Sequence, residues 1–314
     1  MPLIAARIRL VLKGLTPPYV WNALKAVKDR LRPELAPLPE PESEEPPEWE
    51  YVPEGWARRD ADPAVKGWDV DAIVAAYRRK WPSFVRALEG SGPLGVAHEV
   101  PEDVEVPTED RGAHNTVVSY AYVLALTARK KDRVALLDWG GGSGHYYLFS
   151  RALLPDVEIE YHCKDVPKLV AYGRELFPEA AFYEDDSCLE RQYDLVLASN
   201  SLQYSEDWRG TLARLAAAAS GYVYVTRLPV ALRSTSFVVV QRPYAYGYET
   251  EYLGWVVNRD DLLAAAATAG LELVREFVLV DLLSARGAPE DPIEHRGFLF
   301  HAASGRPPER ARPA

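Results

Sequence analysis

Four glycines stand within five positions in the stretch LLDWGGGSGHYY, residues 136–147, and the first of them comes two residues after an acidic residue. Glycine loses more conformational freedom on folding than any other residue, so such a cluster indicates a sharp turn or a close approach to a ligand. The dinucleotide fingerprint G-x-G-x-x-G is not satisfied, because its third glycine position falls on His145. The pattern present is D-x-G-x-G-x-G, formed by Asp138, Gly140, Gly142 and Gly144, with Gly141 between them.

Polar side chains also follow the next expected strands. Asp165 comes 21 residues after the last of these glycines, at the end of a second strand, where an acid commonly accepts hydrogen bonds from a ribose. Asp185 and Asp186 come just after a third strand, in a position to meet an adenine amine, and Asn200 and Ser201 end a fourth. Ligands of open α/β sheets bind beyond the carboxyl ends of the strands, so we expect these side chains around one site.

These residues need a scaffold of alternating strands and helices. Two helices are expected first, at 70–88 and 113–128, and strand-like apolar segments alternate with helical ones from residue 134 onward. We therefore predict an α/β fold with a doubly wound, Rossmann-like sheet, mostly parallel and seven-stranded, whose last two strands form an antiparallel hairpin. The expected strands are 134–139, 157–163, 180–184, 193–199, 221–228, 271–280 and 297–302.

Composition divides the chain into five parts. The first is basic and amphipathic, the second holds seven Glu and no basic residue among many Pro, and the third is rich in Trp and Pro and is expected to be a helical extension. The fourth carries the strand–helix alternation, and the last is a polar tail expected to be disordered. The predicted boundaries are 1–32, 33–50, 51–112, 113–303 and 304–314.

The first 32 residues raise the question of a membrane. Seven basic residues stand there against Asp29 alone, and apolar residues recur at helical spacing, as in helices that lie on an anionic bilayer surface. The same stripes also suit packing on the protein's own core or on a second subunit. Both interpretations stay open. The first implies peripheral contact with a membrane, and the second allows an oligomer.

Together these features resemble the class I S-adenosylmethionine-dependent methyltransferases, over roughly residues 115–301. The resemblance implies S-adenosylmethionine as cofactor, with the glycine turn at the methionine part, Asp165 at the ribose hydroxyls, and Asp185 or Asp186 at adenine. Asp138 would support the turn. The motifs GGGSGHYY, SNSLQYSEDW, QRPYAYGY and TEYLGWVVNR look more narrowly like a bacterial group of methyltransferases whose acceptor is unsettled.

An acceptor site is expected beyond the fourth and fifth strands. The connection after the fifth strand is too long for a simple turn and gathers aromatic and charged residues, which favours an inserted loop or lid over the site. An added hairpin strand with packing aromatics is the alternative. Candidate catalytic or acceptor-binding residues are His145, Tyr204 near the fourth strand, and Arg242, Tyr244, Tyr246 and Glu251 in the insertion. His145 would act as a general base or, alternatively, only hydrogen-bond the cofactor or cap the following helix.

Other function classes are disfavoured by composition. A net charge of −10 argues against a nucleic-acid binder, and two distant cysteines without CxxC spacing indicate neither a disulfide framework nor a zinc site. No metal-ligand spacing is present, and a cytoplasmic location, with or without contact to the inner membrane surface, is expected. A methyltransferase acting on a small molecule or glycan precursor is the leading hypothesis. A non-catalytic binding module of the same fold and a nicotinamide-dependent oxidoreductase are the alternatives.

Overall fold

The computed structural model describes residues 46–289 and 291–302. The predicted basic helices at 1–32, most of the linker at 33–50 and the tail at 304–314 therefore lie outside the described residues. Trp49 and Glu50, which we placed in the linker, begin a strand instead. Among the described helices, none is both long enough and apolar enough to cross a membrane.

Five parallel strands form the centre of the sheet: β2 (Arg133–Trp139), β3 (Glu158–Lys164), β4 (Ala181–Tyr183), β5 (Tyr193–Ser199) and β6 (Ala219–Ala231). They lie in the order β4-β3-β2-β5-β6, so the direction of strand succession reverses between β2 and β5. Their apolar runs are buried on both faces, as parallel strands covered by helices require. The prediction of these strands is confirmed.

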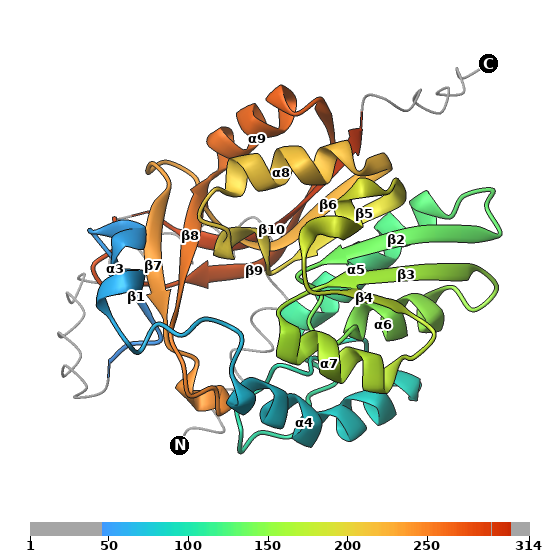
Figure 1. Ribbon diagram of the computed structural model, residues 1–314, viewed down its shortest axis with the longest axis horizontal. Helices are drawn as coiled ribbons and strands as arrows, with labels where there is room; N and C mark the ends of the chain where they lie inside the picture. The colour runs from blue at the N-terminus through green and yellow to red at the C-terminus, as the bar shows by residue number, and fades with distance from the viewer. Residues whose placement is uncertain (1–45, 290, 303–314) are drawn as a thin grey trace, which may run out of the picture. The chain divides into compact units, whose positions relative to one another are not determined.

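The sheet continues beyond β6 with strands of mixed direction (Figure 1). They are β10 (Ile293–Ala302), antiparallel to β6 and to β9 (Leu271–Leu283), then β8 (Tyr252–Asn258), β7 (Phe237–Gln241) and β1 (Trp49–Tyr51). The antiparallel last pair was predicted correctly. The prediction of seven mostly parallel strands was wrong, because the described residues form a mixed sheet of ten strands.

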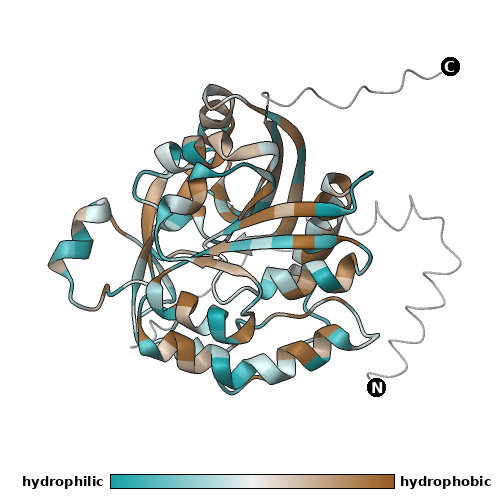
Figure 2. Cartoon of the chain, turned by 45° about the vertical axis from the view of Figure 1, so that its right-hand side comes forward, coloured by the Kyte–Doolittle hydropathy of each residue, from teal (hydrophilic) through white to brown (hydrophobic). Residues whose placement is uncertain are grey.

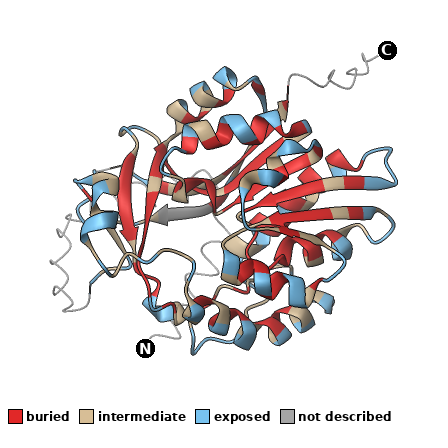
Figure 3. Cartoon of the chain, in the orientation of Figure 1, coloured by how far each residue is buried: buried red, intermediate tan, exposed pale blue. Residues whose placement is uncertain are grey.

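Helices cover both faces of the sheet (Figure 1). On one face lie α5 (Arg111–Thr127), α6 (His145–Leu153) and α7 (Pro167–Leu176), and on the other lie α8 (Trp208–Ala217) and α9 (Arg259–Thr268). Each face has its own apolar core: Leu136 of β2 packs with the first group of helices, and its neighbour Leu137 packs with the second. Because successive side chains of a strand point to opposite faces of the sheet, β2 contributes to both cores. Figure 3 shows this burial along the strands.

Helix α4 (Asp71–Glu89) packs outside α6 and α7 and confirms the helix predicted at 70–88. Its buried residues Ile73, Tyr77, Trp81 and Phe84 recur at helical spacing, while its other face is polar (Figure 2). This amphipathic pattern is what made the helix predictable. Short helical segments complete the fold: η1 (Gly55–Ala57), α3 (Arg58–Ala61), η2 (Asp186–Glu190), η3 (Leu202–Tyr204) and η4 (Tyr244–Tyr246).

The insertion after β6 is sheet for much of its length. Strands β7 and β8 pair antiparallel, from Phe237 opposite Val256 to Gln241 opposite Tyr252, and β1 pairs with the outer edge of β7. Residues 237–240 are buried apolar side chains, which favours a strand in the sheet over an exposed lid. The expectation of an inserted loop or lid is therefore corrected, and only residues 242–251 connect the two strands.

Candidate functional site

The glycine turn lies between β2 and α6. Gly140 has φ of +75° and Gly142 of +60°, which side chains with a Cβ rarely adopt. A Cβ on Gly140 would also stand only 2.2 Å from the Cβ of Ser201, just after β5. Glycine is needed here both for the turn and for the close approach of two strand ends. The turn ends at Gly144, which caps the N-terminus of α6.

Asp165 joins this turn to the end of β3. One carboxylate oxygen accepts the backbone N–H of Gly142 at 2.7 Å, and the other accepts that of Val166 at 2.7 Å. Burial raises the pKa of Asp165, although these two backbone hydrogen bonds oppose the shift. Each oxygen keeps a lone pair free for another donor.

Asp138 lies beneath the turn, at the end of β2, and is fully buried. Its Oδ2 accepts a hydrogen bond from the hydroxyl of Tyr161 at 2.5 Å, and its Oδ1 has no hydrogen-bond partner among the described residues. Burial raises the pKa of Asp138 to about 7, and the Tyr161 hydrogen bond only partly counters it. The carboxyl supports the turn from the core side and does not line the cavity above it.

A cavity of about 210 Å³ opens at the carboxyl ends of β2, β3 and β5 and beside Arg227 of β6. This is the strand-order reversal point, where open α/β sheets bind ligands. Its walls come from the glycine turn, the strand ends, η3 and the extension before and within α4. Among the residues proposed from the sequence, seven line it: Gly140, Gly142, His145, Asp165, Asn200, Ser201 and Tyr204.

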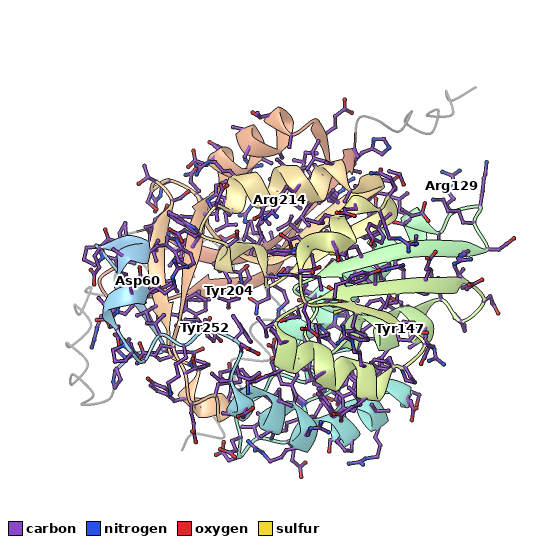
Figure 4. All side chains as sticks on the ribbon, in the orientation of Figure 1. Asp60, Arg129, Tyr147, Tyr204, Arg214 and Tyr252 are labelled. Carbon is purple, nitrogen blue, oxygen red and sulfur yellow. The ribbon has the colours of Figure 1, made fainter. Side chains whose placement is uncertain are left out.

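The paired acids after β4 lie outside this cavity. Asp185 is exposed and accepts the backbone N–H of Ser187 at 3.0 Å, which begins η2. Asp186 is held by the guanidinium of Arg214 on α8 (labelled in Figure 4) and by the Nε1–H of Trp139 at 3.5 Å. The structure therefore gives both acids local partners.

The charged residues of the insertion also form a cluster away from the cavity. Buried Arg242 donates to Glu251 at 3.0 Å and pairs with Glu50 of β1 at 2.8 Å, and the Tyr244 hydroxyl donates to Glu251 at 2.6 Å. This network connects β1 to the ends of β7 and β8. Tyr246 differs from the others, because it lines two neighbouring cavities.

Two charged residues that we did not expect stand in the cavity wall. Glu99, in the loop after α4, accepts hydrogen bonds from Arg227 Nη2 at 2.9 Å and from the Tyr77 hydroxyl at 3.0 Å. Burial acts to raise the pKa of Glu99, but the Arg227 charge and these hydrogen bonds outweigh burial and hold the pKa below its usual range. Glu99 is therefore an ionised carboxylate inside the cavity wall.

Two buried histidines lie beside this ion pair. The rings of His98 and His145 stand 4.2 Å apart between centroids, tilted by 38°. Burial lowers the pKa of His98 to about 4 and that of His145 well below its usual value. Both rings are neutral at neutral pH, so His145 offers a weakly basic nitrogen, weaker than the unperturbed histidine on which its proposed role as general base rested.

Aromatic side chains close the cavity on the side of the extension. Trp68, from the loop before α4, stacks on Tyr252 at 4.5 Å between ring centroids and meets Tyr204 edge-on at 5.2 Å. The Tyr204 hydroxyl donates to Gln241 at 3.0 Å. Figure 4 shows Tyr204 and Tyr252 side by side near the middle of the molecule. An apolar wall with a few polar groups is typical of small-molecule sites.

No protein-family model matches this chain, and no curated protein matches it by sequence. Solved structures do resemble it. A protein of Galdieria sulphuraria assigned as a sarcosine dimethylglycine methyltransferase aligns over 74% of this chain and all of its own, with TM-score 0.47 and 14% identity.

Two further structures align over a smaller share of this chain. The 1,6-didemethyltoxoflavin-N1-methyltransferase of Burkholderia thailandensis, with bound S-adenosylhomocysteine, covers 59% of this chain and 77% of its own, with TM-score 0.42 and 14% identity. The amino pentose methyltransferase CalS10 of Micromonospora echinaspora, with bound S-adenosylmethionine, covers 60% and 91%, with TM-score 0.40 and 14% identity. At TM-scores below 0.5, the function of this chain has to be argued from its own site.

The missed residues carried almost no sequence signal. Arg227 stands in the middle of an apolar strand. The register between β6 and β10 shifts at Arg296–Phe298, opposite this position, and the backbone of Arg227 has φ of +53° there. Glu99 is one acid among several in the loop after α4. The Trp and Pro of the segment containing Trp68 were noted, but nothing local indicated that it would reach the cavity.

Proposed function

We propose that this chain is an S-adenosylmethionine-dependent methyltransferase that acts on a small-molecule or sugar-type acceptor. The observation that carries the proposal is the bond between Asp165 and Gly142 at 2.7 Å, which brings an acidic strand end and the glycine turn to one cavity. That combination suits an adenosyl ligand, because the carboxylate can accept two ribose hydroxyls while the turn lets a ligand approach backbone closely.

The residues present fit such a cofactor. Asp165 retains lone pairs after accepting two backbone N–H groups. A Cβ built on Gly142 would meet only the Tyr77 ring, at 3.5 Å, so the turn leaves room on its cavity side. Trp139, Val166 and Leu169 supply an apolar wall on which an adenine ring can pack. In this proposal Asp185 and Asp186 hold η2 and the Trp139 side chain rather than the base.

When bound, the cofactor supplies an activated methyl group, and the protein has to align the acceptor and keep water out. In this proposal the extension does the second task, because Trp68 and Tyr77 line the cavity opposite the glycine turn. Ionised Glu99 lines the same cavity and fixes the side chains of Arg227 and Tyr77 there. His145 faces the same cavity as a neutral ring and can accept a hydrogen bond there.

The proposal is tested by titration calorimetry with S-adenosylmethionine, S-adenosylhomocysteine and NADH. Both adenosyl ligands are expected to bind and NADH is not. Asp165→Ala should weaken adenosyl binding about 10- to 100-fold, as expected for losing hydrogen bonds to a charged group. Asp185→Ala, also an acid at a strand end but outside the cavity, is the matched control and should bind like wild type.

Each contrary result has a defined meaning. Preference for NADH would favour the oxidoreductase, and binding of neither ligand would leave the proposal without its cofactor. If adenosyl ligands bind but no methyl group passes to any of a panel of small-molecule and sugar acceptors, the binding-module alternative is favoured. Equal loss of binding in Asp165→Ala and Asp185→Ala would contradict the assignment of the cavity.

A further inference from the structure

Arg227 stands where three cavities meet. It lines the cavity at the glycine turn, a second of about 350 Å³ beneath the loop 96–101, and a third of about 640 Å³ beside β1 and the end of β9. The first two also share Glu99 and His145, and the last two share Tyr246 and His295. A ligand in the second cavity would therefore reach the cofactor cavity past the Arg227 side chain.

The backbone at Arg227 is unusual and turns this side chain toward the cavities. β6 and β10 shift register between Arg296 and Phe298, and within that irregularity Arg227 takes φ of +53°. The left-handed backbone conformation costs a residue with a Cβ on the order of 1 kcal/mol or more, so the surrounding structure has to hold Arg227 in it. Strain of this kind gathers at functional sites, which is a reason to ask what the guanidinium binds.

Most donors of this guanidinium are unused. Of its five N–H groups, only one on Nη2 has a hydrogen-bond partner among the described residues, namely Glu99. Its side chain is 32% exposed although it lies within the sheet. The structural arginines differ: Arg242 is 6% exposed and pairs with two carboxylates, and Arg296 also pairs with two. Arg227 therefore has four N–H groups without a partner among the described residues, and its side chain is partly exposed.

Three histidine rings with lowered pKa values line the cavities beside Arg227. His98 and His145 line the second cavity, and His295 lines the second and third. Nε2 of His98 and Nδ1 of His145 have no hydrogen-bond partner among the described residues, and each neutral ring has one N–H donor and one acceptor nitrogen. The carboxylate of Glu99 already neutralises one positive charge. Asp165, Asp110 and Glu48 also line the three cavities, but among the described residues only Glu99 hydrogen-bonds to Arg227, so the free edge of the guanidinium has no acceptor.

We propose that Arg227 binds an oxyanion, a carboxylate or a phosphate, on the methyl acceptor. The free edge of an arginine is shaped for two parallel hydrogen bonds to such a group, and partial burial strengthens them. Glu99 holds the other edge and sets the guanidinium plane, so it is a positioning residue. That the oxyanion belongs to a methyl acceptor rests on the proposed function. The oxyanion site itself is inferred from Arg227 alone.

The test uses probe pairs that share a scaffold and differ in whether they carry an oxyanion, measured by ligand-observed NMR on the full chain with and without S-adenosylhomocysteine. The pairs are benzoate with benzamide and glucuronate with glucose, and phenyl phosphate separates phosphate from carboxylate recognition. We expect the acid of at least one pair to bind about tenfold tighter than its neutral partner, the scale of one charge-assisted pair. Arg227→Gln should abolish this preference.

Controls separate loss of the site from loss of the fold. Arg133→Gln, an exposed arginine paired with Glu160 at the start of β2, should leave the preference intact. Glu99→Gln removes the competing carboxylate and should tighten acid binding several-fold, which damage to the fold would not do. Equal binding of acids and neutral partners, or a preference that survives in Arg227→Gln, would overturn the proposal and favour an uncharged sugar.

Failure of the proposed function is distinguishable from failure of this inference. S-adenosylhomocysteine binding is measured separately for the wild type and for Arg227→Gln, because Arg227 also lines the cavity at the glycine turn, and the acid preference is compared for each protein with and without that ligand. If the wild type binds no adenosyl ligand, the methyltransferase proposal falls, and the acid preference of the ligand-free protein still decides the oxyanion site.

Discussion

At the scale of single residues, burial rather than identity sets what the ionisable groups of the site can do. Asp138 and Asp165 both stand at strand ends beside the same turn. Asp165 has two backbone donors, whereas Asp138 has only the Tyr161 hydroxyl and an unpartnered oxygen. Burial raises the pKa of both, to about 7 for Asp138. Asp138 thus titrates near neutrality while lying under the proposed cofactor.

This shift predicts a pH dependence of stability. Above its ordinary pKa of 3.8, Asp138 loses its proton in the unfolded chain but keeps it in the folded protein up to about pH 7. Its contribution to the free energy of unfolding is therefore full below pH 3.8 and falls, by up to a few kcal/mol, as the pH rises to 7. Asp138→Asn has no group that titrates at this position, so its stability relative to wild type should rise from about pH 4 to about pH 7 and stay constant above that.

The measurement is urea unfolding of both proteins across that pH range. Asp291→Asn is the control, because Asp291 accepts the backbone N–H groups of Arg233 and Ser234 and these hydrogen bonds hold its pKa below the usual value despite burial. Its stability difference from wild type should not grow in the same direction with pH. A constant difference between Asp138→Asn and wild type would contradict the raised pKa.

At the scale of elements, the way α7 lies on the sheet depends on a glycine inside the helix. Gly173 faces Phe182 of β4, and a Cβ there would stand 2.2 Å from the phenyl ring. The same helix and strand flank Asp165, so their spacing bears on the cavity. The sequence pattern predicted both elements, but not their distance, which is set by one missing methyl group.

Gly173→Ala tests this contact, and two effects compete in it. Alanine in a helix interior is favoured over glycine by roughly 0.5–1 kcal/mol. Overpacking a close contact costs typically about 1–3 kcal/mol, so net destabilisation is expected by urea unfolding. Gly92→Ala, where nothing lies within 4 Å of the added carbon, should be close to neutral. Stabilisation of both variants would show that α7 shifts freely.

At the scale of the molecule, the strands added beyond β6 are fastened by the buried Arg242 cluster. Arg242 pairs with Glu50 and Glu251 and donates to the carbonyl of Pro47 at 3.1 Å, so it joins the start of the described chain to the sheet. The cluster does not line the cavity at the glycine turn. The geometry of the Arg242 cluster supports a structural role for these residues. Their residue types had suggested a catalytic role.

Arg242→Met separates these two parts. Breaking a buried ion pair from one side costs about 3–5 kcal/mol, so the free energy of unfolding should fall by that order. Binding of S-adenosylhomocysteine to the folded variant should stay within about threefold of wild type, since distant sites act independently. Arg59→Met, which breaks an exposed pair with Glu206, should cost under about 1 kcal/mol. If Arg242→Met keeps its stability but loses activity, a catalytic role for Arg242 is favoured instead.

The sequence by itself determined the parallel strands, the main helices and the glycine turn, because apolar periodicity and glycine need only local information. It also placed Asp165 and Asn200 at strand ends, and parallel strands necessarily bring such ends together. Only the tertiary structure decided which charges face the cavity. Arg227 enters through a bulge, Glu99 arrives on a loop from the extension, and Arg242 and Glu251 neutralise each other elsewhere. These outcomes depend on packing between distant segments, which no local pattern records.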